Sequence, residues 1–222
     1  MGFLYLLFLP RSMLPVPHDH PAVAVFRAIS REPLVRNYLG RLFLHHHDTY
    51  QHSSRVGILS VYLGFVNRVP ENHLRLLAYA GALHDVGKLH LPTVLLDKSG
   101  ALTEEDLAQL RRHPRLSFFE LQLFDPEIVR RIVVAHHEYQ LDGYPRQNFL
   151  AIDHPAPVED RSRDQHVQLL AQMVSAADMF DGLRNKRAYK PVYALAETEE
   201  IMRRQFTGDP RFIDQLVRSS FN

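Results

Sequence analysis

Apolar side chains recur at intervals of three and four residues along most of the chain, whereas the period-two alternation of a half-buried strand is almost absent. This spacing places the apolar side chains on one face of a helix, so it predicts an all-α protein, a helical bundle. Several of the predicted helices open with proline in the first turn, where its missing N–H costs nothing. In the first part of the chain they span residues 21–30, 33–44, 47–67 and 70–84.

Turn signals set the boundaries of the next elements. Gly87 is expected to end the fourth helix, because glycine readily adopts the conformation that closes a helix. Thr103, followed three residues later by Asp106, has the spacing of a capping box. The helix that begins there is expected to stop near His113 and Pro114.

A long irregular stretch, residues 139–164, follows a helix expected over residues 125–136. A loop of this length inside a compact domain usually has a function, such as covering a binding site. A long helix over residues 165–183 and two more in the tail complete the chain. We predict that residues 1–43 form an N-terminal segment with helices that pack on a larger domain, residues 44–222.

The amino-acid composition limits which partners and which kinds of functional site the chain can have. Lys and Arg total 26 against 25 Asp and Glu, so the net charge of +1 provides no broad basic face for a DNA or RNA duplex. The absence of cysteine excludes disulfide scaffolds, thiolate metal sites and cysteine nucleophiles. The 14 histidines, many of them beside acids, therefore favour a metal site built from nitrogen and oxygen ligands.

The apolar segment 3–10 is far shorter than the roughly 20 residues of a membrane helix. No basic residue precedes it as in a signal peptide. We expect it to pack as a strand or turn, with a short anchor as the alternative, and we expect no membrane span and a cytoplasmic location.

Several acids and histidines stand where one metal ion could bind them. His84 and Asp85 are adjacent, and two adjacent ligands reach one ion where a helix ends. Asp48 and His52 are four residues apart, on one face of a predicted helix. Asp178 lies in an apolar run, where an uncompensated carboxylate would cost several kcal/mol, so a nearby cation is expected.

Together these positions predict two metal sites with Asp85 between them. Two ions about 3.5–4 Å apart can bind a phosphate, activate a water molecule and stabilise the leaving oxygen. The alternative is that one or two of the residues are bystanders. The first predicted group is His52, His84, Asp85 and Asp178, and the second is His113, His136 and His137.

The motifs that contain these residues resemble, in their order, those of the HD-domain phosphohydrolases, and among them the HD-GYP cyclic di-GMP phosphodiesterases. The resemblance spans about residues 44–222. It rests on TYQHSSRV at 49–56, LHDVGK at 83–88, LTEE at 102–105 with His113, HHE at 136–138, DGYP at 142–145, ADMFD at 177–181 and RAYK at 187–190.

The resemblance implies roles for individual residues. The seven residues of the two groups correspond to metal ligands, and Asp48 stands in the place of an acidic ligand to a third metal. Asp85 and Lys88 are implied to be catalytic. The ring of Tyr144 is implied to stack on a guanine. The implied substrate contacts are Lys88, Gly143, Tyr144, Pro145, Arg187 and Lys190.

The implied reaction is hydrolysis of cyclic di-GMP to linear pGpG by a metal-bound hydroxide, with further hydrolysis to GMP as an extension. The implied cofactors are two divalent ions, with a third as an alternative, and the nitrogen and oxygen ligands favour iron or manganese over zinc. The Gly-Tyr-Pro motif is shortened, because Asp142 and Gly143 run directly into Tyr144 and Pro145.

Two other functions stay open at this point. The first is that of another HD phosphohydrolase, acting on a nucleotide or a guanosine polyphosphate. The second is a non-catalytic receptor or interaction module for cyclic di-GMP, with a diguanylate cyclase or another regulatory protein as its partner.

Overall fold

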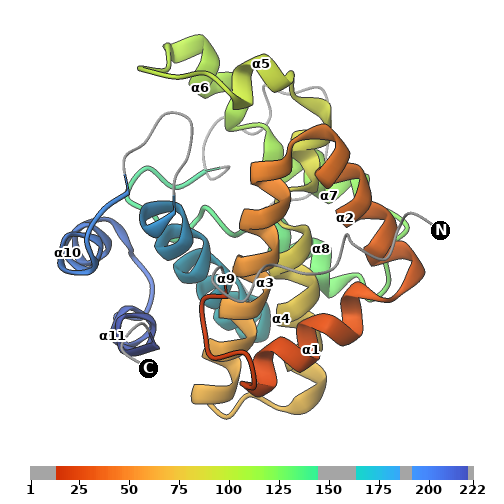
Figure 1. Cartoon of the computed structure of the whole chain (residues 1–222), viewed down its shortest axis with the longest axis vertical. Coiled ribbons are helices and arrows are strands. Elements are labelled where there is room, and N and C mark those ends of the chain that lie inside the picture. Colours follow the sequence, from red (N-terminus) through yellow and green to blue (C-terminus); the bar gives the residue numbers. More distant parts are fainter. Residues whose placement is uncertain (1–13, 145–163, 186–191, 220–222) are drawn as a thin grey trace.

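The computed structural model describes residues 14–144, 164–185 and 192–219. Within these residues every regular element is a helix, and an isolated bridge joins Gln140 to Phe206 (Figure 1). The predicted all-α fold is confirmed. In chain order the elements are α1 (Pro21–Ser30), α2 (Pro33–His45), α3 (His47–Val66), α4 (Glu71–Leu83), the 3-10 helix η3 (Val86–His90), α5 (Thr93–Leu96), α6 (Glu104–Leu110), α7 (His113–Glu120), α8 (Ile128–Val134), α9 (Gln165–Arg184), α10 (Leu195–Gln205) and α11 (Arg211–Ser219).

Helix α3 is the central element and is buried along most of its length. Helices α1, α2, α4, α9 and α11 all pack against it. The crossing with α4 is close, since a Cβ atom on Gly81 would lie 2.7 Å from the Cα of Gly57. One hydrophobic core therefore extends from α1 to α11.

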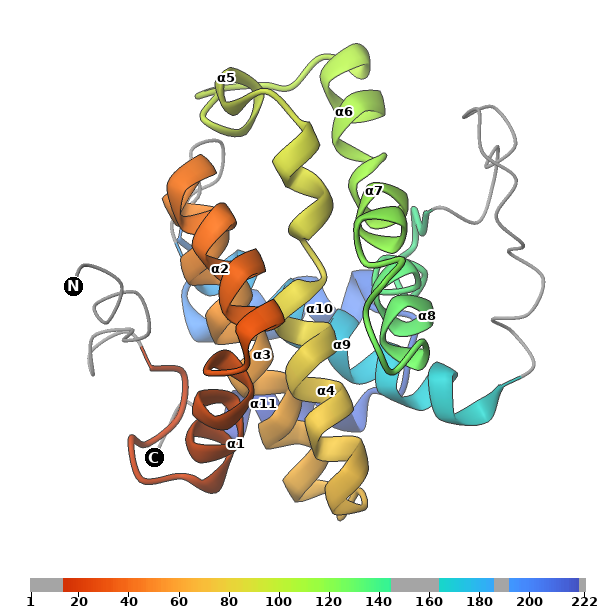
Figure 2. The same cartoon turned by 90° about the vertical axis from the view of Figure 1, so that its right-hand side faces the viewer.

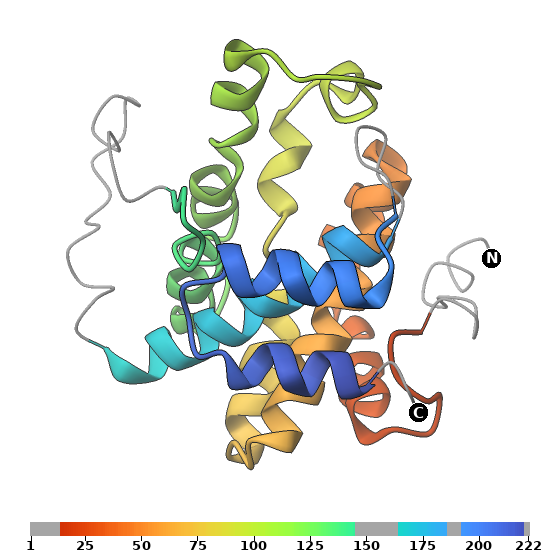
Figure 3. The ribbon, with the colours of Figure 1, turned by 90° about the vertical axis from the view of Figure 1, so that its left-hand side faces the viewer.

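Helix α8 adds Val129, Ile132 and Val133 to this core, whereas α5 and α6 lie outside it. Helices α5 and α6 lie together at one end of the molecule (Figure 2). Helices α10 and α11 lie side by side and pack on α9 (Figure 3). The helices α1 and α2 belong to the shared core, through buried side chains such as Phe26 and Leu42, while a domain boundary at residue 43 stays a prediction.

Most helix boundaries agree with the sequence pattern. The first four helices and α9 begin and end within one residue of the predicted positions. The capping box of α6 is present, because Thr103 Oγ1 accepts from the Asp106 amide and the Asp106 carboxylate accepts from the Thr103 amide. The two tail helices are present as α10 and α11.

The prediction that Gly87 ends the fourth helix was wrong. Helix α4 ends at Leu83, and Gly87 lies inside η3. A Cβ atom there would lie 2.2 Å from the carbonyl oxygen of His113 and 2.4 Å from the amide nitrogen of Ser117. The glycine therefore allows η3 to touch the backbone of α7, rather than closing a helix.

The prediction that one helix runs from Thr103 to His113 was also wrong. Helix α6 ends at Leu110, and His113 is the first residue of α7. Pro114 lies in the first turn of α7, where a missing N–H is tolerated. A proline expected to end one helix thus begins the next, and α8 is likewise shorter than predicted, covering Ile128–Val134.

Candidate metal centre

The seven residues of the two predicted groups come together from five parts of the fold. They are His52 in α3, His84 and Asp85 after α4, His113 at the start of α7, His136 and His137 after α8, and Asp178 in α9. They form three overlapping sets in which the potential ligand atoms all lie within 4.8 Å of one another. The sets are His52, His84 and Asp85; His84, His136 and Asp178; and His113, His136 and His137.

Three of the histidines share one hydrogen-bond arrangement. The Nδ1 atom of each lies within hydrogen-bond distance of the backbone carbonyl oxygen three residues earlier. Because a carbonyl oxygen only accepts, Nδ1 carries a proton, which leaves Nε2 as the ring nitrogen that can bind a metal. This is the tautomer that binds a metal through Nε2. The pairs are His84 with Gly81 (2.8 Å), His113 with Leu110 (2.7 Å) and His136 with Val133 (2.5 Å).

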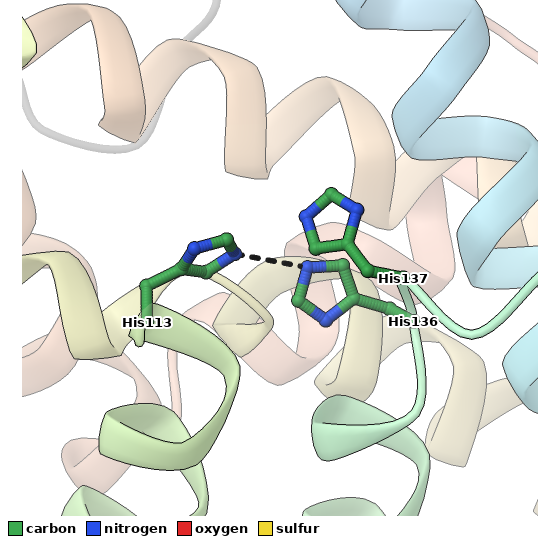
Figure 4. A group of neighbouring side chains, drawn as sticks. All are labelled: His113, His136 and His137. Carbon is green, nitrogen blue, oxygen red and sulfur yellow. Dashed lines mark hydrogen bonds between the residues drawn. The ribbon is translucent and has the colours of Figure 1, made fainter. Parts of the chain in front are cut away.

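Two of these Nε2 atoms face each other. Those of His113 and His136 are 3.2 Å apart, with His137 beside them (Figure 4). Burial lowers the pKa of His136 to about 4 and that of His113 well below its usual value, so both rings are neutral near pH 7. Two lone pairs at this distance repel each other, and a bound cation would turn that repulsion into two attractive contacts.

Asp85 lies between the sets. Its Oδ2 is 2.6 Å from Nζ of Lys88 and 3.3 Å from Nε2 of His84, and its Oδ1 is 3.2 Å from Nε2 of His113. Burial works to raise the pKa of Asp85, but Lys88 and His84 hold it well below the usual value. The carboxylate is therefore ionised and central to the cluster.

Two buried atoms of the centre have no hydrogen-bond partner among the described residues, namely Nε2 of His84 and Oδ1 of Asp85. An unsatisfied buried polar atom costs about 1–3 kcal/mol. Both are ligand types that divalent ions accept. The residues present therefore fit a divalent metal.

Asp178 supplies the second carboxylate. Its Oδ1 is 2.9 Å from Nε2 of His52, and its Oδ2 is 3.9 Å from Nε2 of His137. Burial works to raise its pKa, but the hydrogen bond from His52 and the neighbouring His137 hold it well below the usual value. The buried acid that the sequence placed in an apolar helix thus lies among histidines.

Two charged residues at the centre received no role in the sequence analysis. Asp181, 1% exposed, accepts from Nδ1 of His52 at 2.7 Å. Arg55 donates two hydrogen bonds to the same carboxylate, at 2.6 and 3.0 Å. The sequence spacing could have indicated both residues. Arg55 lies three residues after His52, and Asp181 lies three residues after Asp178, in each case on the same helix.

Ser117 is another residue that the sequence analysis did not single out. Its hydroxyl donates to the carbonyl oxygen of His84 at 2.7 Å and accepts from the amide of Gly87 at 2.8 Å. It thereby holds the segment that carries His84 and Asp85 against α7. Nothing in its local sequence pattern distinguishes it from other serines.

The other predicted site residues are placed differently. Asp48 is exposed in the first turn of α3 and belongs to none of the three sets. Lys88 pairs with Asp85. The ring of Tyr144 stacks on His137, with centroids 4.5 Å apart and planes 20° apart. Gly143 lies in the preceding turn. Pro145, Arg187 and Lys190 are outside the described residues.

Comparison with known proteins agrees with this geometry. Residues 41–151, half of the chain, match a family model described as an HD domain. The chain belongs to the HD-domain family. The predicted family is confirmed. HD domains bind divalent metals, and the three sets are the groups of this HD domain that could hold them.

Relatives of this HD domain include bacterial phosphodiesterases. The chain is 30% identical to the cyclic di-GMP phosphodiesterase PA4108 of Pseudomonas aeruginosa, over 86% of this chain and 43% of that protein. It is 32% identical to the cyclic di-GMP phosphodiesterase response regulator RpfG of Xanthomonas campestris, over 73% and 40%. It is also 32% identical to the 3′3′-cGAMP-specific phosphodiesterase 1 of Vibrio cholerae, over 78% and 38%.

The chain spans about two-fifths of the length of these three relatives. Among the residues that the structure describes, no helix is both long and apolar enough to cross a membrane.

Proposed function

We propose that this chain is a metal-dependent phosphodiesterase that hydrolyses a cyclic dinucleotide, with cyclic di-GMP as the first candidate substrate and linear pGpG as its product. The observation that carries the proposal is the overlap of three ligand sets through His84 and His136. Overlapping sets suit two neighbouring ions, and two-metal sites are used to cleave phosphodiester bonds. The printed functions of the relatives point to the same substrate class.

The proposed ligands are the seven clustered residues, and the proposed ions are two divalent ions, iron or manganese ahead of zinc. Nitrogen and carboxylate donors without sulfur favour this choice. A third ion would need Asp48, which is exposed outside the sets. When bound, such ions would lower the pKa of a water molecule and neutralise charge on the phosphodiester oxygens.

The residues around the ions would supply charge compensation and substrate contacts. Asp85 stays ionised because Lys88 and His84 offset its burial. The ammonium of Lys88, 2.6 Å from Asp85, would offset the negative charge that gathers on the phosphoryl oxygens. We keep Gly143, Tyr144, Pro145, Arg187 and Lys190 as proposed substrate contacts, and residues 44–222 as the proposed catalytic domain on which 1–43 pack.

The proposal is tested on protein purified without oxygen and loaded with Fe²⁺ or Mn²⁺. Metal content is measured first. The loaded protein is then incubated separately with cyclic di-GMP, with 3′3′-cGAMP and with a guanosine tetraphosphate. The products are separated and identified by mass spectrometry. We expect pGpG from cyclic di-GMP, and we expect its formation to stop when a chelator removes the metal.

Two outcomes would contradict the proposal. Tight binding of cyclic di-GMP with no product under any metal would make the chain a receptor or interaction module. Hydrolysis of the guanosine polyphosphate alone would assign it to another class of HD phosphohydrolase.

A further inference from the structure

Arg111 is an exposed cation beside the metal centre. It lies two residues before the ligand His113, in the turn between α6 and α7. The carbon at the centre of its guanidinium is 5.6 Å from the centroid of the Tyr144 ring, within the range of a cation–π contact. Since Tyr144 also stacks on His137, Arg111 is joined to the metal centre through one aromatic ring.

Within the described parts of the chain, Arg111 forms no ion pair with a carboxylate, unlike the other cations at the centre. Lys88 and Arg55, the other cations described at the centre, are each paired with a buried carboxylate, Asp85 and Asp181. An unpaired, exposed guanidinium at the edge of a site for phosphate esters is available for a phosphate of the ligand.

A cyclic dinucleotide carries two phosphodiesters, each with one negative charge. In the proposed reaction the phosphodiester being cleaved lies at the metal ions and Lys88, so the other needs a counter-charge nearby. Arg111 meets this need, because it lies next to the centre but does not contact a proposed metal ligand directly. Guanidinium and phosphate match in geometry and form paired charge-assisted hydrogen bonds.

We propose that Arg111 binds the second phosphodiester of the bound cyclic dinucleotide, the one that is not being cleaved, with Tyr144 holding its guanidinium in place. This inference rests on the proposed function. It makes Arg111 a determinant of selectivity for cyclic dinucleotides over esters with a single phosphate, and it gives the ring of Tyr144 a supporting role next to His137.

The test compares two substrates in the metal-loaded enzyme, cyclic di-GMP and bis(4-nitrophenyl) phosphate, which has one phosphodiester only. We expect Arg111→Gln to raise the KM for cyclic di-GMP about 10-fold or more, the usual effect of losing a hydrogen bond to a charged group. A much smaller change is expected for the nitrophenyl ester, at unchanged metal content. Arg111→Lys is expected to recover part of the loss.

Arg112→Gln is the matched control, because it removes the same charge from the neighbouring exposed position. Wild-type KM for cyclic di-GMP in Arg111→Gln would overturn the inference. So would an equal loss on both substrates, which indicates a structural effect through Tyr144, or an equal loss in Arg112→Gln, which indicates unspecific electrostatics. If the wild type cleaves the nitrophenyl ester but no cyclic dinucleotide, the proposed function itself fails and this inference with it.

Discussion

His52 differs from three other histidines of the centre in what holds its Nδ1 atom. Those of His84, His113 and His136 face backbone carbonyls, which keep their place as long as the helix does. That of His52 faces the Asp181 carboxylate, 129 positions away in the chain. Its orientation therefore depends on a contact between the side chains of α3 and α9.

Asp181→Asn is expected to weaken metal binding about 10- to 100-fold, the usual cost of losing a carboxylate that orients a metal-ligating histidine. The amide keeps the shape of the side chain but loses the charge that fixes the proton on Nδ1 of His52. Metal affinity is measured by competition with a chelator, and helical content by circular dichroism.

The same substitution leaves Arg55 buried without its ionic partner, which by itself is destabilising. The double variant Asp181→Asn with Arg55→Gln removes both charges and serves as the control for folding. If this double variant is folded and binds metal as tightly as the wild type, Asp181 does not orient His52.

His136 belongs to two of the three ligand sets, so its loss is expected to have a wide effect. His136→Asn should lower the metal stoichiometry by about one ion and abolish hydrolysis of cyclic di-GMP, because two neighbouring ions are needed. Metal analysis of the purified variant checks this. His47→Asn, an exposed histidine at the start of α3, is the control, and full metal content with a full rate in His136→Asn would make His136 structural.

At the scale of elements, the contact between η3 and α7 sets the distance between two parts of the centre. Asp85 immediately precedes η3, and His113 opens α7. Gly87 lets the two backbones touch, and the Ser117 hydroxyl joins them through two hydrogen bonds. The position of Asp85 relative to His113 therefore follows from this contact.

Gly87→Ala is expected to force η3 away from α7, because the added methyl group would lie 2.2 Å from a backbone oxygen that no side-chain rotation can move. Overpacking of this kind costs roughly 1–3 kcal/mol or more. Urea denaturation should show the lower free energy of unfolding, and metal affinity should fall with it.

Gly40→Ala is the matched control in α2. A Cβ atom there meets nothing within 4 Å, and alanine favours a helix by up to about 1 kcal/mol over glycine. This variant should be as stable as the wild type or more so. Equal effects of the two substitutions would show that Gly87 is not required for the close contact.

At the scale of the whole molecule, the buried histidines link stability to pH. Burial lowers the pKa of His113, His136 and His137 below the usual 6.5, to about 4 for His136. Between these values the unfolded chain binds protons that the folded chain does not, so stability rises with pH. His84 acts in the opposite direction, because Asp85, against the effect of burial, raises its pKa.

With three lowered pKa values against one raised, we expect the metal-free protein to lose stability as the pH falls from about 6.5 to about 4. The buried carboxylates, whose pKa values are lowered from 3.8, stabilise the folded state until the pH falls below this window. Melting temperatures of chelator-treated protein check the trend. It should flatten in His136→Asn, and a melting temperature that rises toward pH 4 would contradict it.

The longer helices and the residue types of the cluster follow from the sequence itself. Apolar spacing and local signals such as the Thr103 cap depend on neighbours within one or two turns, so they can be recognised along the chain. That the histidines and a buried acid such as Asp178 lie together was also predictable, because a buried carboxylate needs a compensating partner wherever the fold places it.

Contacts between distant segments were decided by the tertiary structure alone. The local pattern predicted that Gly87 ends a helix. In the structure a glycine is needed there because the α7 backbone leaves no room for a Cβ atom, and the local pattern does not reveal this contact. Asp181 meets His52 only because α3 and α9 pack together, and Arg111 contacts Tyr144 only because the turn before α7 lies beside the segment after α8. The periodicity of a helix encodes which of its faces is buried, but not which residues of another element that face will meet.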